Sequence, residues 1–262
     1  MPDSNYNTLT YSVESNTAKI ILDRPPANLI DREMTLEYHD ALKKADADQK
    51  IRVIVLAGNG NGLSGGLDLN YIEKFNSEEM REFLQLFYVE TMKITRGLSK
   101  PIIAAVHGYA REGACTLAFA CDMIIASDNA DFGYPGVPNL AAPPGMHVWI
   151  LQKLIGRMKA AELILTGKIL KATEAEKMGL ITKVVPANSL MLEAEKIAQK
   201  IAQMSPLAIK KARHLMYEME DMSFHDIPEK AVEALSSAFN TEDSREARKA
   251  FIEKREPVWK GK

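Results

Sequence analysis

The sequence predicts an α/β fold with a helical C-terminal region, and three observations support this prediction. Short β-rich runs alternate with helical patterns in the first half of the 262-residue chain. From about Leu190 the strand patterns stop and four helical stretches follow. No repeat, low-complexity tract or Pro/Gly linker divides the chain. Because such alternation is typical of βαβ crossovers, we expect an α/β core over residues 1–190 and a helical region over 191–262.

Four apolar runs have the composition of buried strands, at residues 18–22, 51–56, 102–106 and 123–126. Asp31 is the candidate N-cap of a helix whose apolar stripe comprises Met34, Tyr38, Ala41, Leu42 and Ala45. A second helix is predicted after Ser77, with acidic residues in its first turn and Met80, Phe83, Leu84 and Phe87 facing inward. The C-terminal helices are expected at residues 190–203, 206–219, 227–239 and 244–255.

Composition excludes several classes of function. A formal net charge of −2 argues against a broad nucleic-acid surface. No apolar run approaches the ~20 residues of a membrane-spanning helix, and the first residues lack the pattern of a signal peptide. We therefore expect a cytoplasmic protein with no nucleic-acid or membrane partner. Cys115 and Cys121 are expected to be buried and reduced, and their spacing predicts no metal site.

A glycine-rich segment, AGNGNGLSGGLDL, follows the strand predicted at 51–56. Its Gly60, Gly62 and Gly65 fit the dinucleotide-binding pattern G-x-G-x-x-G, but no crossover helix follows directly. A phosphate-binding P-loop is excluded because no Gly-Lys-Ser/Thr occurs. A surface loop is a further alternative. The interpretation that fits best is a turn whose backbone N–H approaches a ligand, because glycine carries no Cβ.

A second turn of the same kind follows the strand predicted at 102–106. There the segment HGYAREGACTLAFACD passes from strand to helix, with Gly113 at or near the helix start. Free amides and the helix dipole both favour negative charge at such a position. One N–H from the glycine-rich segment and the N–H of Gly113 would form an oxyanion hole for a carbonyl.

These two segments resemble the motifs of the crotonase (enoyl-CoA hydratase/isomerase) superfamily. LSGGLDL is similar to its F-S-A-G-A-D-L loop, and KPIIAAVHGYAREGACTLAFACDMIIAS is similar to the block that follows. The similarity begins at LDRPPAN, continues through DFGYP and LIGRMKAAELILTGKILKATEAEKMGLITKVVP, and ends at AFIEKREPVW. The resemblance therefore covers almost the whole chain.

The resemblance implies a spiral of ββα units with a C-terminal trimerisation region, hence a homotrimer or a dimer of trimers. It implies a coenzyme A (CoA) thioester as substrate and no permanently bound cofactor. It assigns Gly65 and Gly113 to the oxyanion hole. Residues matching the substrate and CoA path are Pro26, Ala27, Leu29, Asp68, Leu69, Thr116, Tyr134 and Gly136. Phe251 and Lys254 match positions that approach the nucleotide bound to a neighbouring subunit.

The chain departs from the family at its two catalytic glutamates, which are replaced by Thr116 and Gly136. Neither residue can act as acid or base at neutral pH. Glu112 and His147 are the candidate replacements, although a helix-start carboxylate and an ordinary hydrogen-bonded histidine are the plainer interpretations. We expect Tyr134 to pack, Glu90 to face solvent and His107 to hold its loop. Tyr71 is a weak candidate, and no role is predicted for His39, His214 and His225, the first two on surface helices.

Two hypotheses follow. The first is an acyl-CoA enzyme of the hydratase/isomerase type that holds a thioester oxyanion on backbone amides; thioester hydrolysis, decarboxylation and double-bond shift are alternative reactions. The second is a catalytically silent acyl-CoA-binding subunit. The missing glutamates favour the second hypothesis, whereas the retained glycines favour the first.

Overall fold

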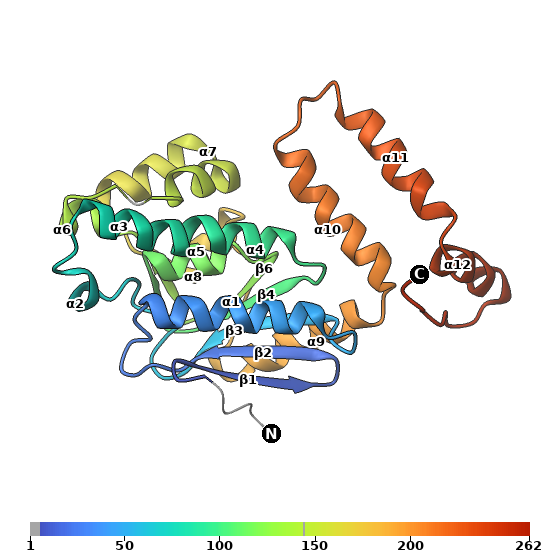
Figure 1. Cartoon of the computed structure of the whole chain (residues 1–262), viewed down its shortest axis with the longest axis horizontal. Coiled ribbons are helices and arrows are strands. Elements are labelled where there is room, and N and C mark those ends of the chain that lie inside the picture. The colour runs from blue at the N-terminus through green and yellow to red at the C-terminus, as the bar shows by residue number, and fades with distance from the viewer. Residues whose placement is uncertain (1–5, 144) are drawn as a thin grey trace.

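The computed structural model of the chain describes residues 6–143 and 145–262, which form two sheets surrounded by helices (Figure 1). The larger sheet has the order β1-β2-β3-β4-β6-β9, and the smaller has the order β5-β7-β8. The strands of the larger sheet are β1 (Leu9–Glu14), β2 (Thr17–Leu22), β3 (Val53–Gly58), β4 (Ile102–Val106), β6 (Met123–Ser127) and β9 (Lys183–Val185). Those of the smaller sheet are β5 (Tyr109–Arg111), β7 (Asp131–Gly133) and β8 (Leu170–Lys171).

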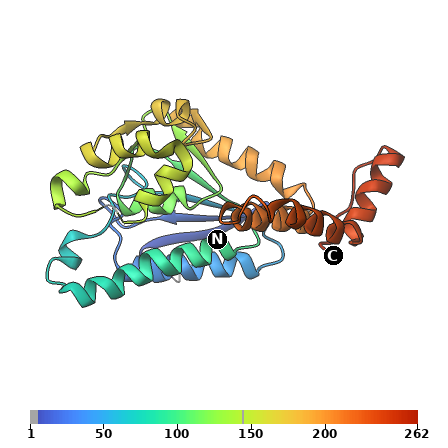
Figure 2. The ribbon, with the colours of Figure 1, turned by 90° about the horizontal axis from the view of Figure 1, so that it is seen from above.

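The larger sheet is buried on both faces, which explains the continuous apolar runs in its central strands. Its pairs are parallel except β1 with β2, so successive strands need crossover helices. Alternate residues of β3 and β4 point to opposite cores. Ile54 and Leu56 join the core beneath α1 (Arg32–Ala47), whereas Val53 and Val55 join the core beneath α9 (Leu190–Ala202). Figure 2 shows these two helices on opposite sides of the sheet.

The four predicted strands are confirmed, with boundaries shifted by up to two residues. The predicted N-cap of α1 is also confirmed, because the Asp31 side chain accepts a hydrogen bond from the Met34 amide. The next long helix, α3 (Ser77–Leu84), begins one residue earlier than predicted and is capped by Asn76. It continues through the π-helix η1 (Gln85–Glu90) into α4 (Thr91–Gly97). Phe83 and Phe87 are buried, as predicted.

Shorter helices lie in the connections that follow the strands. They are α2 (Leu69–Ile72), α5 (Gly113–Phe119), α6 (Gly136–Leu140) and α8 (Ala172–Lys177), together with the 3-10 helix η2 (Ala187–Ser189). The longest helix, α7 (His147–Thr166), is interrupted at Gly156, whose φ is 77°.

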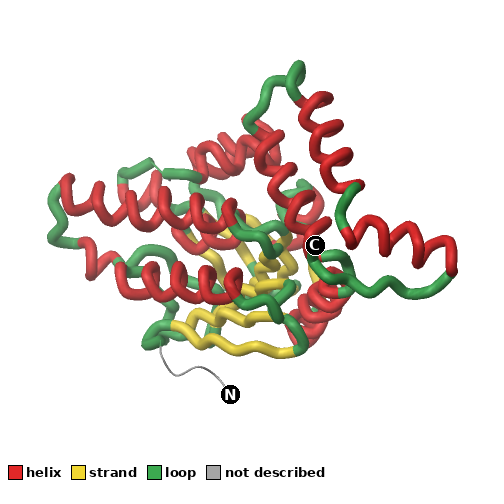
Figure 3. Tube along the Cα trace, turned by 45° about the vertical axis from the view of Figure 1, so that its right-hand side comes forward, coloured by secondary structure: helices red, strands yellow, loops and turns green. Residues whose placement is uncertain are grey.

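The C-terminal region is helical, as predicted, with α10 (Pro206–Glu220), α11 (Ile227–Phe239) and α12 (Glu242–Glu253) following α9. The last three helices extend away from the sheets as an arm (Figures 1 and 3). Arg213 anchors α10 to the body, because its buried guanidinium donates to Asp122 and to the carbonyls of Thr95 and Leu98. The first helix, α9, packs on the sheet itself. The predicted division of the chain near residue 190 stays a prediction.

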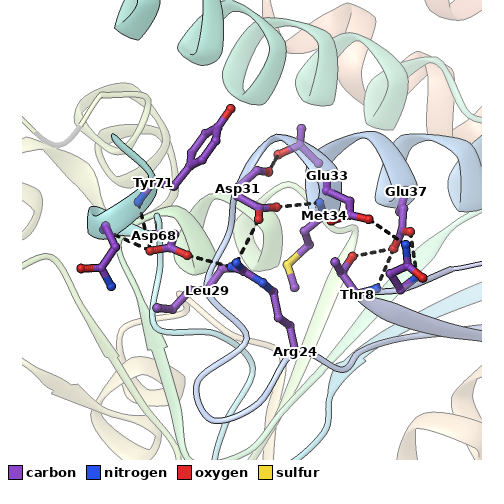
Figure 4. Close-up of polar contacts among 12 residues, drawn as sticks. Thr8, Arg24, Leu29, Asp31, Glu33, Met34, Glu37, Asp68 and Tyr71 are labelled. Atoms are coloured by element: carbon purple, nitrogen blue, oxygen red, sulfur yellow. Dashed lines mark hydrogen bonds and ion pairs between the residues drawn. The ribbon is translucent and has the colours of Figure 1, made fainter. Parts of the chain in front are cut away.

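Arg24 holds the segment after β2 against the start of α1 and α2 (Figure 4). Its guanidinium donates to the Leu29 carbonyl at 2.7 Å and to Asp68 at 2.9 Å, and it pairs with Asp31 at 3.1 Å. Asp68 also accepts hydrogen bonds from the Asn70 and Tyr71 amides at the N-terminus of α2. One planar cation therefore fixes two helix caps and one loop, an arrangement for which a guanidinium fork is suited.

We predict that Arg24→Met destabilises the fold, because it leaves the largely buried Asp31 and Asp68 side chains without their shared cation. Since Arg24 is one-third exposed, the expected loss in unfolding free energy is about 1–3 kcal/mol. Arg24→Lys should lose less, because it keeps the charge. Urea denaturation measures the change, and Arg32→Met, at an exposed arginine of α1, is the matched control. Equal midpoints for the Arg24→Met and control variants would contradict the proposed clamp.

Candidate active site

Two turns meet where the loop after β3 runs beside β5. Ser64 pairs with Ala110 in a parallel bridge, and the Arg111 amide donates to the Ser64 carbonyl at 3.1 Å. The approach requires glycine at position 66, where φ is 94° and an added Cβ would lie 2.8 Å from the Arg111 carbonyl oxygen. The buried Asn28 amide group holds the other side of this loop by donating to the carbonyls of Asn59, Gly62 and Leu63.

Backbone pairing decides which amides of this loop are free, and it corrects one prediction. The Gly65 N–H donates to the Ala27 carbonyl at 2.8 Å, so it is not available to a ligand. The Gly66 N–H donates to Ser64 Oγ, and the Asp68 N–H donates to the Ile30 carbonyl. Within the described part of the chain, the Leu67 N–H has no acceptor. The geometry therefore moves the candidate donor from Gly65 to Leu67.

Gly113 keeps its predicted availability. It is the first residue of α5, and its N–H has no acceptor among the residues that the structure describes. It adjoins the first turn, since a Cβ added at Gly113 would lie 3.2 Å from Leu67 Cδ2 and 3.1 Å from Phe87 Cζ. Leu67 and Gly113, whose amides lack acceptors in the described ranges, therefore lie close together although they belong to different strand-to-helix connections.

Glu112 is a strained residue that carries a half-buried carboxylate. Its φ of 43° and ψ of −109° belong to a region that side chains rarely adopt, at a cost of about 1–3 kcal/mol. Glu112 follows β5, and Gly136 lies shortly after β7, which runs parallel to β5. The Gly136 amide donates a short hydrogen bond to the Glu112 carboxylate. Burial raises the pKa of this carboxyl, and the Gly136 hydrogen bond partly offsets the rise.

Tyr88 is a site residue that the sequence did not indicate. The π-helix η1 puts Phe87 against Gly113 and Tyr88 against Gly145, and Tyr88 is close enough to Glu112 for its charge to act on the phenol. Burial, reinforced by the charge of Glu112, raises the pKa of Tyr88 to about 12. The phenol is therefore protonated at neutral pH. An aromatic pair at adjacent positions inside a helical pattern was the available signal for it.

Thr116 of α5 and His147, the first residue of α7, form a buried pair. Their side chains are joined at 3.0 Å between Thr116 Oγ1 and His147 Nε2. The imidazole lies 4.3 Å from the ring of Tyr134, which is also buried, as predicted for a packing residue. Burial lowers the pKa of His147 to about 3, so the imidazole is neutral at physiological pH.

The other predicted residues divide into two groups. Ala27 and Leu29 lie against Gly65, Pro26 and Leu69 are exposed, and the Asp68 carboxylate is held by Arg24. Phe251 and Lys254 are exposed on or just after α12, at the opposite end of the molecule from α2 and α6 (Figure 1). A single chain does not bring these two residues to the turns.

The remaining histidines and candidates have structural surroundings. His39 is buried and bonds to Thr91, so its predicted surface position is wrong; α4 packs over this side of α1. His214 is partly buried and contacts the Leu98 carbonyl, whereas His225 is exposed. His107 bonds to the Gly60 carbonyl, which confirms its role in holding the loop. Tyr71 packs on Phe75 and Phe83, and Glu90 is partly exposed beside Lys93.

Cys115 and Cys121 are buried and free, as expected. In the described ranges, no cluster of three or more histidine, cysteine, aspartate or glutamate residues could hold a metal ion. No helix in those ranges is long and apolar enough to cross a bilayer.

The free amides of Leu67 and Gly113 and the half-buried Glu112 carboxylate are groups that an enzyme can use to stabilise a negatively charged oxygen. The enoyl-CoA hydratase/isomerase family model matches residues 12–262 of this chain. The chain therefore belongs to that family, whose members act on acyl-CoA thioesters, and the resemblance inferred from its motifs is confirmed.

Individual relatives cover nearly the full chain. The chain is 34% identical to the "Probable enoyl-CoA hydratase, mitochondrial" of Dictyostelium discoideum, over 97% of this chain and 91% of that protein. It is 31% identical to the crotonyl-CoA hydratase of Syntrophomonas wolfei, over 95% and 96%. The crystal structure of an enoyl-CoA hydratase from Bacillus anthracis superposes with a TM-score of 0.93 at 32% identity, covering 98% of this chain and all of the other. These similarities confirm the crotonase-like fold.

We predict that His147 makes the fold less stable in acid. Below pH 6.5 the unfolded chain protonates this imidazole, whereas the folded chain does so only near pH 3. The unfolding free energy should therefore fall by up to about 1.4 kcal/mol per pH unit as the pH drops below 6.5. His39, whose pKa burial lowers to about 4, adds a loss of the same sign.

Urea denaturation at pH 7, 6 and 5 measures this slope. His147→Gln keeps a hydrogen-bonding side chain but removes the titration, so its slope should be smaller than that of the parent. Parallel slopes for the two proteins would show that His147 is not held neutral.

Proposed function

We propose that this enzyme stabilises the thioester oxygen of an acyl-CoA substrate with the N–H groups of Leu67 and Gly113. Both amides lack an acceptor among the described residues, and both belong to connections that leave a strand. Negative charge that develops on the thioester oxygen during proton transfer would be shared between two preorganised donors. This pair of free amides is the observation that carries the proposal.

The best-supported reaction is a proton transfer beside the thioester carbonyl that uses one carboxylate, as in a double-bond shift of an enoyl-CoA. The neighbouring carboxylates Asp68 and Asp131 are held in ion pairs by Arg24, Arg111 and Lys171. Thr116 and Gly136 offer no acid or base. A double-bond shift needs one group that takes a proton from one carbon and returns it to another.

Hydration is a second candidate, because the curated relatives include the crotonyl-CoA hydratase of Syntrophomonas wolfei and a carnitinyl-CoA dehydratase of Citrobacter koseri. It requires proton transfer both from water and to carbon, and a single carboxylate would have to serve both steps. Thioester hydrolysis and decarboxylation have no further support from the side chains at the turns.

The test is a panel of 2-enoyl-, 3-enoyl- and 3-hydroxyacyl-CoA esters incubated in D₂O and followed by mass spectrometry and NMR. We expect deuterium to enter carbon-bound positions and the 3-enoyl ester to convert to the 2-enoyl ester. Gly113→Pro deletes one donor at the first position of α5, where the missing N–H breaks no helix hydrogen bond, and should lower turnover about 10²–10³-fold. Gly113→Ala keeps the N–H and is the matched control.

Circular dichroism must show that both variants are folded. Equal turnover for the folded proline and alanine variants would remove Gly113 from the oxyanion hole. Binding of CoA esters by the parent with no exchange or conversion would instead support the catalytically silent subunit.

We also propose that the arm docks on other copies of the chain, giving the expected homotrimer or dimer of trimers. Support comes from its exposed apolar side chains: Leu235, Phe239, Phe251 and Ile252 are 56–86% exposed. Exposed apolar side chains on charged helices are typical of an interaction surface, and closed symmetry is the usual outcome for identical chains. Phe251 and Lys254 would then reach the CoA of a neighbouring subunit. The cytoplasmic location expected from the sequence stays a prediction.

Multi-angle light scattering should give the mass of three or six chains. A double charge substitution, Phe251→Glu with Ile252→Glu, should lower that mass, whereas Lys43→Glu, on an exposed face of α1, should not. A monomeric parent at micromolar concentration would refute the assembly.

A further inference from the structure

We propose that Glu112 is the acid–base group of this site, and that its carboxylate lies in space that is open because position 136 carries no side chain. The proposal rests on the proposed function, since it assigns the residue that moves the proton. It also makes a separate claim, which is that the identities of residues 112 and 136 depend on each other.

The ends of two parallel strands bring these residues together. Ala110 pairs with Phe132 and Arg111 with Gly133, so the chain leaves β5 and β7 side by side in the same direction. The Glu112 amide continues this pairing by donating to the Gly133 carbonyl at 3.0 Å. Glu112 is the first residue after β5, and the Gly136 amide reaches its carboxylate from the other strand end.

The contact leaves no room for a second side chain. A Cβ added at Gly136 would lie 2.9 Å from Glu112 Oε1 and 3.3 Å from its Cδ. The Cβ of any side chain at position 136 would therefore clash with the Glu112 carboxylate. Conversely, a longer side chain at position 136 would reach this same space if position 112 were a glycine.

The surroundings of Glu112 do not suit a purely structural carboxylate. Asp68, Asp131 and Asp122 are each paired with an arginine, whereas Glu112 forms no ion pair with any residue that the structure describes. Its one described hydrogen bond uses Oε1, so Oε2 is left to accept a proton. A half-buried, unpaired charge on a strained backbone is costly, and strain of this kind is concentrated at functional sites.

The other polar groups here are less able to transfer a proton. Tyr88 is a protonated phenol, and Thr116 bonds to His147. The His147 ring is fully buried behind Thr116. Of these polar residues, only Glu112 is next to Gly113 in the chain. It also lies against Gly66 of the opposite turn, since a Cβ added at Gly66 would be 3.2 Å from the Glu112 Cβ.

The reaction then balances without any additional reactant. The Glu112 carboxylate takes a proton from the α-carbon of a 3-enoyl-CoA, and the C–H electron pair enters the conjugated system as a dienolate. The thioester oxygen carries the charge and accepts hydrogen bonds from Leu67 and Gly113. The neutral Glu112 acid returns the proton to the γ-carbon. A C–H bond is broken, another is formed, the double bond moves by one position, and nothing is oxidised or reduced.

The experiment compares the parent with Glu112→Gln, with Gly136→Glu, with Glu112→Gly and with the exchange variant Glu112→Gly/Gly136→Glu. The readouts are deuterium exchange into CoA esters, kcat and KM for the 3-enoyl ester, ester binding by calorimetry, and folding by circular dichroism. Glu90→Gln, a partly exposed glutamate on the flanking helix, is the control for loss of a nearby charge.

We expect Glu112→Gln to lower kcat about 100-fold or more, as for a general base, with ester binding nearly unchanged. Glu112→Gly should be equally poor. The exchange variant should recover at least about tenfold over it, because the carboxylate returns to the same space from the other strand end. Gly136→Glu alone should lose activity through the clash.

The outcomes separate the claims. A parent that binds esters but exchanges no proton would end the proposed function and this inference together. An active parent whose folded Glu112→Gln variant stays within about threefold would overturn the role of Glu112 and leave the proposed function standing. Loss in Glu112→Gln without recovery in a folded exchange variant would refute the shared space while keeping Glu112 as the base.

Discussion

The backbone pairing of the loop Leu63–Asp68 is the constraint on which the site depends. This loop lies between two neighbours, with the segment Ala27–Ile30 on one side and β5 on the other. Each neighbour takes some of the loop's hydrogen-bonding groups, and buried amides are almost always satisfied in this way. Among the described residues, the Leu67 N–H then has no acceptor, and the Gly113 N–H has none either. The proposed oxyanion donors are thus amides that this pairing leaves without an acceptor.

The parallel pair of β5 and β7 imposes a second constraint. Because both strands end at the same edge, the residues that follow them compete for one volume. Here that volume contains the Glu112 carboxylate, and glycine at position 136 is what permits it. The backbone at residue 112 is strained, and the hydrogen bonds from Gly136 and to Gly133 hold it in place. The carboxylate next to the Gly113 amide is therefore carried by a residue with a strained backbone.

Local sequence patterns predicted the elements well and the contacts between them less well. The strand at residues 102–106 could be predicted because a fully buried parallel strand is apolar at every position. The cap of α1 could be predicted because Asp31 contacts an amide only three residues away. Gly65 was the wrong donor because its pairing with Ala27 crosses a long stretch of chain. His39 is buried by α4, which its own helix cannot reveal. Tyr88 approaches the site because the helix widens at η1, and a 3.6-residue period does not anticipate that.

Burial acts on His147 and Glu112 in the same sense, since it favours the neutral form of each. It lowers the pKa of His147 to about 3 and raises the pKa of the Glu112 carboxyl. No cation is therefore available from these groups to balance an enolate. Proton transfer to Glu112 would solve this problem, because the negative charge leaves the carboxylate as it forms on the thioester oxygen. The net charge of the site stays constant, and only its location changes. Catalysis would then depend on how well the Leu67 and Gly113 amides receive the charge that Glu112 gives up.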